Sequence, residues 1–264
     1  MLLIVAKRQF YWWLTKVSVF VILNTMIIDF EYQPVLEDYK KNGDMKLASI
    51  LKILENSGNK HSDRAGDAIL EGSNSGVAWV LTDWMLELIK YPKYGDKILA
   101  RTWSEPVKQP LVCTRDFEMY CNGELTVKGT TKWIRLDLNT GRPCKVTPEI
   151  IEKYQPEDKY TFEEARLPRL AAPEAFSNEI ELPIRRADID FNDHVHNLTY
   201  LDYALEVLPA DIYENRNFKK LRISYKLAVK SGEEIICKYA NVEGRHICCI
   251  YGKNGDLRTQ IEFD

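Results

Sequence analysis

Apolar residues in the first half of the chain recur at a helical spacing in one segment. Residues 45–57 place theirs three or four positions apart, on one face of an α-helix: Leu47, Ile50, Leu51 and Leu54. Gly58 follows this segment and predicts that the helix ends there. Longer stretches around the helix have strand character and predict strands at 29–36, 77–89, 97–103, 111–121 and 124–138.

Turn-forming residues indicate how these elements are joined. Asn122-Gly123 lies between the last two predicted strands and is a strong hairpin signal, because both turn residues must adopt positive φ. Thr147 fits the N-cap of a short helix at 147–154. Residues 156–177 show little periodicity, and they contain prolines that are typical of a linker: Pro156, Pro168 and Pro173.

The order of predicted elements then repeats. The second half predicts a strand at 179–184, a helix at 197–208, and strands at 221–229, 234–242, 245–251 and 257–263. Short sequences repeat as well: G-D-K-I-L at 95–99 matches G-E-E-I-I at 232–236, and N-G-E-L at 122–125 matches N-G-D-L at 254–257. Both matches occur in the same order after a helix, which indicates a duplicated unit.

Each unit contains one strand, one helix and then an antiparallel meander, which predicts an α+β fold. A half-buried sheet must cover its apolar face, and one central helix can cover it when the sheet curls around that helix. This arrangement is a hotdog, so the chain predicts a double hotdog. We expect an N-terminal hotdog domain at 29–155, a linker at 156–177 and a C-terminal hotdog domain at 178–264.

Residues 1–28 form an N-terminal extension whose role stays open. An apolar run from 10 to 28 follows Lys7 and Arg8, but Lys16 interrupts it. A membrane-spanning helix needs about 20 predominantly apolar residues. We favour translation from a start at Met26, with a membrane anchor and an additional packed helix as alternatives, and we expect no membrane association.

Charge and cysteine content exclude several functional classes. The chain carries 36 basic and 39 acidic side chains, a net charge of −3, so it lacks the basic excess typical of a nucleic-acid partner. Its six cysteines include no C-x-x-C pair, which argues against a zinc knuckle or a thioredoxin-like site. We expect reduced thiols and a cytoplasmic location.

The segment 185–197 carries the densest group of polar residues, between the strand and the helix of the second unit. Asp190, Asn192 and His194 alternate there, and in an extended segment alternate side chains point the same way. A carboxylate, an amide and an imidazole in one pocket suffice for hydrolysis. The alternative is ordinary turn and capping chemistry, with Asn197 as the N-cap of the following helix.

Several motifs make the chain similar to the plant and bacterial acyl-ACP thioesterases. D-I-D-F-N-D-H-V-H-N-L-T-Y at 188–200 resembles the family pattern D-[IL]-D-x-N-x-H-V-N-N-x-x-Y, and L-E-V-L-P at 205–209 resembles L-E-x-x-P. The first unit agrees through W-V-L-T at 79–82, Y-P-K-Y-G-D at 91–96 and T-W at 102–103. The resemblance covers about residues 29–252.

The resemblance implies a hydrolase that releases fatty acids from acyl carrier protein without a metal or redox cofactor. Asp190, Asn192 and His194 would form the catalytic set. Asn192 would polarise the thioester carbonyl or position water, and His194 would orient the substrate or assist proton transfer. Asp190 would act as base or nucleophile, or would fix the other two. Trp79, Asn197 and Tyr200 would contact substrate, and the first hotdog would set the acyl chain length.

Two residues depart from the family pattern. Ala228 occupies the position of a family glutamate in the motif Y-[RK]-[RK]-E-[CV], and His196 replaces the first asparagine of an N-N pair. Either Asp190 suffices, or an acid such as Glu206 substitutes, or activity is low. Two alternatives stay open: an acyl-CoA thioesterase, and a non-catalytic acyl-binding protein, which Ala228 favours.

A carrier-protein partner is acidic, so the resemblance also implies a basic docking face. The candidate residues are Arg185, Arg186, Lys219, Lys220, Arg222 and Lys226. His61 and His246 are expected to be surface or structural residues. Two fused hotdogs supply the pairing that single hotdogs gain by dimerising, so we expect a monomer or a homodimer.

Overall fold

The computed structural model describes residues 26–68, 76–163, 167–215 and 218–264. The predictions for residues 1–25, including the alternative of a membrane anchor, lie outside this part. In the described ranges no helix is both long and apolar enough to cross a membrane.

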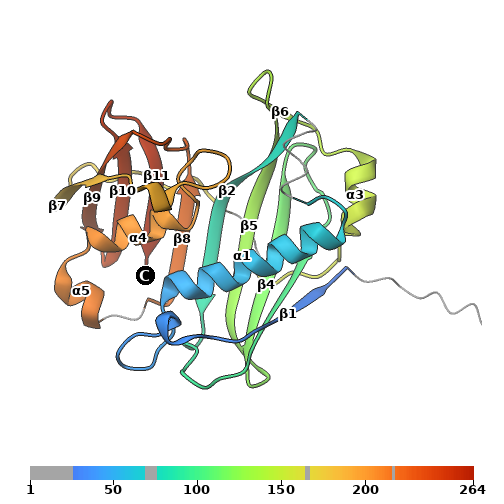
Figure 1. Ribbon diagram of the computed structural model, residues 1–264, viewed down its shortest axis with the longest axis horizontal. Helices are drawn as coiled ribbons and strands as arrows, with labels where there is room; N and C mark the ends of the chain where they lie inside the picture. Colours follow the sequence, from blue (N-terminus) through green and yellow to red (C-terminus); the bar gives the residue numbers. More distant parts are fainter. Residues whose placement is uncertain (1–25, 69–75, 164–166, 216–217) are drawn as a thin grey trace, which may run out of the picture.

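One continuous antiparallel sheet runs through the molecule (Figure 1). Its strands have the order β1-β3-β4-β5-β2-β8-β11-β10-β9-β7, and β6 pairs with β5. The first half contributes β1 Ile28–Tyr32, β2 Val77–Leu88, β3 Ile98–Ser104, β4 Cys113–Cys121, β5 Glu124–Asp137 and β6 Arg142–Cys144. The second half contributes β7 Asn178–Pro183, β8 Lys220–Tyr225, β9 Glu234–Val242, β10 Arg245–Gly252 and β11 Leu257–Phe263.

The strand order confirms the duplicated architecture. Read outward from the centre, β2-β5-β4-β3-β1 on one side corresponds to β8-β11-β10-β9-β7 on the other. The two central strands pair with each other, from Asp83 opposite Ser224 to Glu87 opposite Lys220. The two units therefore form the predicted double hotdog with an unbroken sheet.

A central helix lies against the sheet in each half. α1 Leu47–Arg64 crosses the first half and α4 Thr199–Glu206 lies against the second (Figure 1). α1 buries its apolar face completely, with Ile50, Leu51, Ile53 and Leu54 all at 0 % exposure. The other helices of the described residues are short: η1 Leu36–Asp38, α3 Pro148–Tyr154, η3 Arg186–Asp188 and α5 Ala210–Asn215.

The helix end predicted at Gly58 is wrong, because α1 continues through Gly58 to Arg64. The glycine is needed for space. Arg115 of β4 approaches so closely that its Nη1 donates a hydrogen bond of 2.7 Å to the Gly58 carbonyl. A Cβ at position 58 would lie 2.8 Å from the same nitrogen. A glycine in a helical pattern can thus mark a close contact from another element instead of a terminus.

Replacing Gly58 with alanine is expected to lower the free energy of unfolding by about 1–3 kcal/mol, as overpacking does. Arg115 must move, although alanine favours the helix. Urea denaturation would measure the loss, with the exposed neighbour Lys60→Ala as a control expected within about 0.5 kcal/mol of wild type. Unchanged or increased stability of Gly58→Ala would contradict this account.

Turns and element ends agree with the sequence less uniformly. Asn122 and Gly123 have φ values of 52° and 85°, which confirms the hairpin turn. Thr147 precedes α3 as predicted but makes no side-chain capping hydrogen bond. α4 is shorter than the predicted helix and has Leu198 at its N-cap, so the alternative that Asn197 is the N-cap is wrong.

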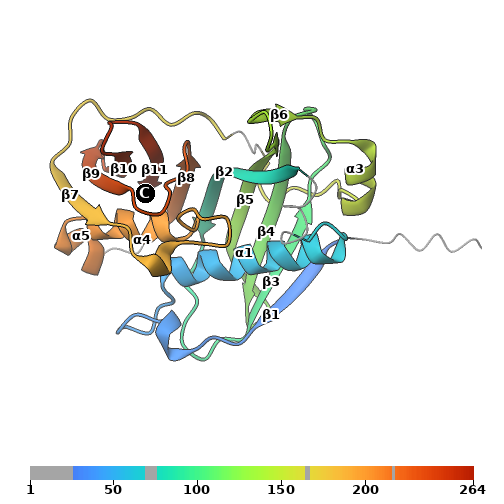
Figure 2. The same cartoon turned by 45° about the horizontal axis from the view of Figure 1, so that its top comes forward.

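The described parts of the segment 156–177 connect the two halves along the face of the sheet opposite α1 (Figure 2). Hydrogen bonds hold this segment to the sheet. Trp103 Nε1 donates to the Lys159 carbonyl over 2.8 Å, and the Thr161 amide donates to Asp116 Oδ2 over 2.7 Å. The segment therefore covers the outer face of the sheet as well as joining the two units.

Candidate functional site

A buried carboxylate anchors the loop between β7 and α4. Asp188, at the end of η3, is 2 % exposed. It accepts hydrogen bonds from the Arg185 amide at 2.8 Å, from Arg185 Nη2 at 2.7 Å and from the Tyr203 hydroxyl at 2.6 Å. Burial alone would raise the pKa of Asp188, but the bonds from Arg185 and Tyr203 outweigh it and hold the pKa below 3.8.

The following residues form a tight turn. The Asp190 amide donates to the His194 carbonyl at 2.8 Å, and Asp190 Oδ1 accepts the amides of Asn192 at 2.8 Å and His194 at 3.4 Å. Asp193 takes φ 59° in the left-handed region. The expected extended segment is therefore wrong. The turn that Asp190 closes holds the backbone amides of Asn192 and His194, and the convergence of the three side chains and their catalytic roles stay predictions.

The first unit contains the same loop. Asp38, at the end of η1, is 1 % exposed and accepts the Val35 amide and the Tyr32 hydroxyl, each at 3.0 Å. The Lys40 amide then donates to the Asp44 carbonyl at 2.8 Å, as Asp190 does to His194. Sequence analysis missed this repeat, although D-x-x-x-N occurs before both helices, at 38–42 and 188–192.

Hydrogen bonds connect the second loop to the strands and helix beside it. The Tyr200 hydroxyl accepts the Val229 amide at 2.9 Å, and the Tyr225 hydroxyl donates to the Asn197 carbonyl at 3.0 Å. Tyr200 is 2 % exposed. Tyr200 and Asn197 thus hold the loop in place, and substrate contact by either residue stays a prediction.

An acid from the first half faces this loop. Glu55 of α1 is 15 % exposed, and its Oε2 lies 3.6 Å from His196 Nε2. Burial, with the negative charge of Asp190 as the second cause, raises the pKa of Glu55 to about 7. Sequence analysis missed Glu55. The available signal was its position one helical turn beyond Leu51, in line with the buried stripe of the helix.

The tautomer of His196 follows from its second contact. The Leu198 amide donates to His196 Nδ1 over 3.3 Å, so the neutral ring carries its proton on Nε2, toward Glu55. Burial lowers the pKa of His196, and the Asp190 charge opposes this effect. We call Glu55, His196 and Asp190 the acid–imidazole cluster.

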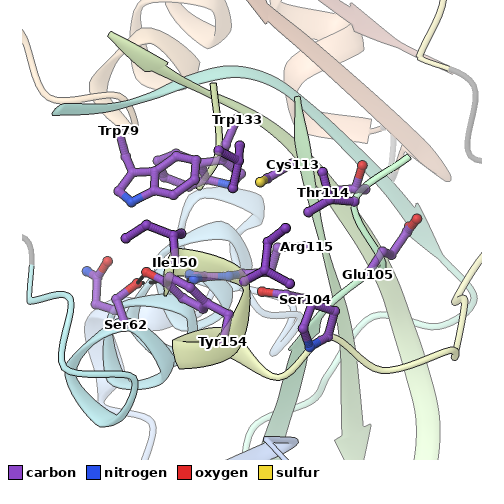
Figure 3. A pocket seen from close by; sticks show the side chains of 15 residues that line it. Ser62, Trp79, Ser104, Glu105, Cys113, Thr114, Arg115, Trp133, Ile150 and Tyr154 are labelled. Atoms are coloured by element: carbon purple, nitrogen blue, oxygen red, sulfur yellow. Dashed lines mark hydrogen bonds between the residues drawn. The ribbon is translucent and has the colours of Figure 1, made fainter. Parts of the chain in front are cut away.

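An apolar pocket lies in the first half of the molecule (Figure 3). Its cavity volume is about 50 Å³, which is well below the roughly 300–1,000 Å³ of small-molecule sites. Trp79 and Trp133 line it from the sheet, with Ile150 and Tyr154 from α3. Trp79 Nε1 donates to Asp67 Oδ2 at 2.8 Å. The structure thus places Trp79 in this pocket, which none of the predicted catalytic residues lines.

Helix α1 links the pocket to the acid–imidazole cluster. Asn59 and Ser62 line the pocket, and they follow Glu55 by four and seven residues. Residues at this spacing share one face of a helix. A single helical face therefore runs from the acid of the cluster to the apolar cavity.

Two family models together match most of the chain. The N-terminal domain of acyl-ACP thioesterases matches residues 27–154, and the C-terminal domain matches residues 171–262. The chain belongs to the acyl-ACP thioesterase family. Among curated relatives, an oleoyl-acyl carrier protein thioesterase of Arabidopsis thaliana is 30 % identical over 57 % of this chain and 44 % of its own length. One from Coriandrum sativum is 24 % identical over 70 % of this chain and 54 % of its own length. The chain thus spans about half the length of the curated relatives it matches.

Solved structures show the same fold. A 12:0-ACP thioesterase from Umbellularia californica superposes with a TM-score of 0.83 at 16 % identity, covering 92 % of this chain and 98 % of its own. An acyl-ACP thioesterase from Bacteroides thetaiotaomicron gives a TM-score of 0.80 at 20 % identity, covering 90 % and 97 %. The double hotdog therefore belongs to the whole described chain.

The two positions singled out by the missing family glutamate differ in their relation to the predicted catalytic turn. Position 228 lies beside it, because the carbonyl of the neighbouring Val229 accepts the Val195 amide at 2.8 Å. Ala228 is exposed, and its carbonyl accepts a hydrogen bond of 2.8 Å from Arg258 Nη1. Glu206 is exposed at the end of α4, where it lines a surface hollow with Asp202 and Tyr213. Glu55 is the acid that lies beside His196.

The basic residues considered for carrier docking do not form one patch. Lys219 and Lys220 lie at the start of β8, whereas Lys226 lies just beyond its end, about 20 Å away at the rise of a strand. Arg222 is turned toward Asp83, at 3.4 Å, and the linker. Arg185 is engaged by Asp188 close to the predicted catalytic turn.

The two remaining histidines are buried, at 0 % exposure for His61 and 1 % for His246. His61 packs edge-on against Tyr154, and His246 Nδ1 lies 2.7 Å from the Tyr239 hydroxyl. Both are structural residues, which is one of the two roles that the sequence predicted for them. In the described residues no group of three or more potential ligands is arranged to hold a metal ion.

Proposed function

We propose that this protein hydrolyses acyl-ACP thioesters and releases a free fatty acid. Family membership supports the reaction class. The observation that carries the proposal is the shared face of α1, where Glu55 faces the acid–imidazole cluster and Asn59 lines the apolar pocket. A long acyl chain needs an apolar cavity, and its thioester needs polar groups at the mouth of that cavity.

In this proposal the acyl chain enters the pocket of the first half and pushes its lining side chains apart, because the cavity of about 50 Å³ is smaller than the acyl chain. The thioester carbonyl lies at the turn of Asp190, Asn192 and His194. Asn192 polarises the carbonyl or positions water, and His194 orients the substrate. Water adds to the carbonyl carbon, the carbon–sulfur bond breaks, and the thiolate leaves. An ordinary thiol has a pKa of about 8.5, so the leaving group needs little protonation near neutral pH.

Thiol release from palmitoyl-ACP and octanoyl-ACP, compared with the matching CoA esters, tests the function. We expect turnover, and a higher kcat/KM with the carrier protein than with CoA. A preference for CoA would make the protein an acyl-CoA thioesterase. Acyl binding without turnover on either carrier would support the non-catalytic alternative, which the exposed Ala228 in place of a family glutamate favours.

Filling the apolar pocket is expected to change chain-length preference. Ile150→Trp adds bulk inside the cavity, so kcat/KM for palmitoyl-ACP should fall at least about tenfold relative to octanoyl-ACP. A change of this size corresponds to the free energy of burying about two methylenes. Leu138→Trp, at a side chain that is 50 % exposed, is the matched control and should change neither substrate. Equal losses for both acyl chains would place the acyl chain elsewhere.

We propose that the protein acts in the cytoplasm. All six cysteines are free thiols in the structure, which suits a reducing compartment. The names of the Arabidopsis thaliana and Coriandrum sativum relatives place those proteins in the chloroplast. Cell fractionation followed by immunodetection would test the proposal.

A further inference from the structure

Glu55 occupies a position where the two halves of the molecule differ. The shared loop geometry places Asp38 and Asp188 at equivalent positions, so the equivalent of Glu55 is Leu205 of α4. Leu205 packs against the hydrophobic core. The first half thus carries an acid on its helix where the second half carries an ordinary apolar residue.

In the loops, the functional groups lie in the second half and not in the first. The second loop presents Asp190 and His196, whereas the first has Lys40 and Lys46 at the equivalent positions. The loop of the second half and the helix of the first half therefore combine an imidazole with two carboxylates. The loop of the first half and the helix of the second half instead combine two lysines with Leu205. Of these two equivalent places, only one holds an acid–imidazole cluster. That cluster lies at the junction of the two halves.

The surroundings of Glu55 suit a catalytic acid or base. Its ion-pair contact within the described chain is His196, at 3.6 Å, and not a lysine or arginine that would fix its charge. The titratable groups that face it are His196 and Asp190 from the loop and Tyr225 from β8. A side chain that is 15 % exposed still reaches solvent, and thus an attacking water.

We propose that Glu55 is the general base of this site and supplies the carboxylate that position 228 lacks. This rests on the proposed function. The Glu55 carboxylate takes one proton from a water molecule while the water oxygen bonds to the thioester carbonyl carbon. The carbonyl then re-forms, the carbon–sulfur bond breaks, and the leaving thiolate takes the proton from Glu55. His196, through Nε2, is a positioning residue for the Glu55 carboxylate.

Burial and the nearby Asp190 charge place the pKa of Glu55 at about 7, close to the optimum for a base that works near neutral pH. The base form is the ionised carboxylate. Activity should therefore rise with pH up to about 7 and fall about tenfold per unit below that value. A base with the ordinary glutamate pKa of 4.5 would place the same limb near that value.

The decisive experiment is the pH–rate profile of acyl-ACP hydrolysis by wild type, Glu55→Gln, Glu55→Asp and the control Asp63→Asn. Asp63 is an exposed carboxylate on the same helix. We expect Glu55→Gln to lower kcat at least about 100-fold with KM within about twofold, and to remove the limb near pH 7. Glu55→Asp should recover part of kcat, and Asp63→Asn should match wild type.

Folding is checked by the melting temperature at pH 8. Folding raises the pKa of Glu55 from its ordinary value of 4.5 to about 7, so its favourable contribution to stability is complete below 4.5 and is lost as pH rises through 7. The glutamine side chain avoids a buried charge, so Glu55→Gln should melt no lower than wild type. A Glu55→Gln enzyme with more than half of wild-type kcat would overturn the role of Glu55 and leave the hydrolase standing. An inactive wild type would overturn both.

Discussion

Replacing Asp190 with alanine is expected to lower kcat for acyl-ACP hydrolysis by about 10²- to 10⁴-fold, the range for loss of an acid–base group. Two effects combine. Asp190 Oδ1 accepts the amides of Asn192 and His194, so the turn that presents these residues loses its acceptor. The negative charge beside Glu55 also disappears, which lowers the pKa of Glu55 and makes it a weaker base. Thiol release under saturating substrate would measure the change.

Two further variants separate these effects. Asp190→Asn keeps a side-chain oxygen that can accept the turn amides but removes the charge, so it should lose less activity than alanine. Lys40→Ala changes the equivalent position of the first loop, which lies outside the proposed site, and should retain wild-type kcat. Wild-type activity in Asp190→Ala would exclude Asp190 from the chemistry and from the turn's function. Equal losses in alanine and asparagine variants would assign the whole effect to the charge.

The fold was predictable because each unit repeats a local pattern. The 3.6-residue period at 45–57, the strand stretches and Asn122-Gly123 each report short-range preferences, and the structure follows them in α1, β2 to β5 and the positive φ of the turn. Duplication added a second, independent indication, because the two halves had to agree. The same element pattern placed the polar loop correctly between β7 and α4.

The features that were missed all depend on residues far away in the sequence. Gly58 resembled a helix end until Arg115, 57 positions later, was seen to need the space. Glu55 resembled an ordinary polar position on a helix until His196, 141 residues later, was found beside it. Local patterns carry no information about which partner approaches a given face. An acid in line with a buried stripe is the local sign that such a partner exists.

Removing the anchor of the loop is expected to have the largest effect on stability. Asp188→Ala leaves the Tyr203 hydroxyl and the Arg185 amide without their acceptor at a site that is 2 % exposed. Stranding buried donors and breaking a charged hydrogen bond should cost about 2–5 kcal/mol in the free energy of unfolding. Urea denaturation at pH 7 would measure the loss.

The pH dependence provides a sharper test of the same carboxylate. The pKa of Asp188 is lower in the folded protein than its ordinary value of 3.8, so the folded state binds its proton less tightly than the unfolded state. The stabilising contribution is therefore complete above 3.8 and is lost as pH falls through the folded pKa. Wild type should lose stability below about pH 4 more steeply than Asp188→Ala, because the variant has already lost this contribution.

Asp38→Ala is the matched variant, because Asp38 anchors the first loop and its pKa is also held below 3.8. Burial opposes that shift, and hydrogen bonds from Val35 and Lys52 outweigh it. Both variants should lose similar stability, but they should differ in function. Asp188→Ala disturbs the loop that carries Asp190 and His196, so its kcat should fall even at temperatures where it remains folded. Asp38→Ala should keep kcat. Equal kcat in the two folded variants would show that the anchor holds the fold and not the geometry of the site.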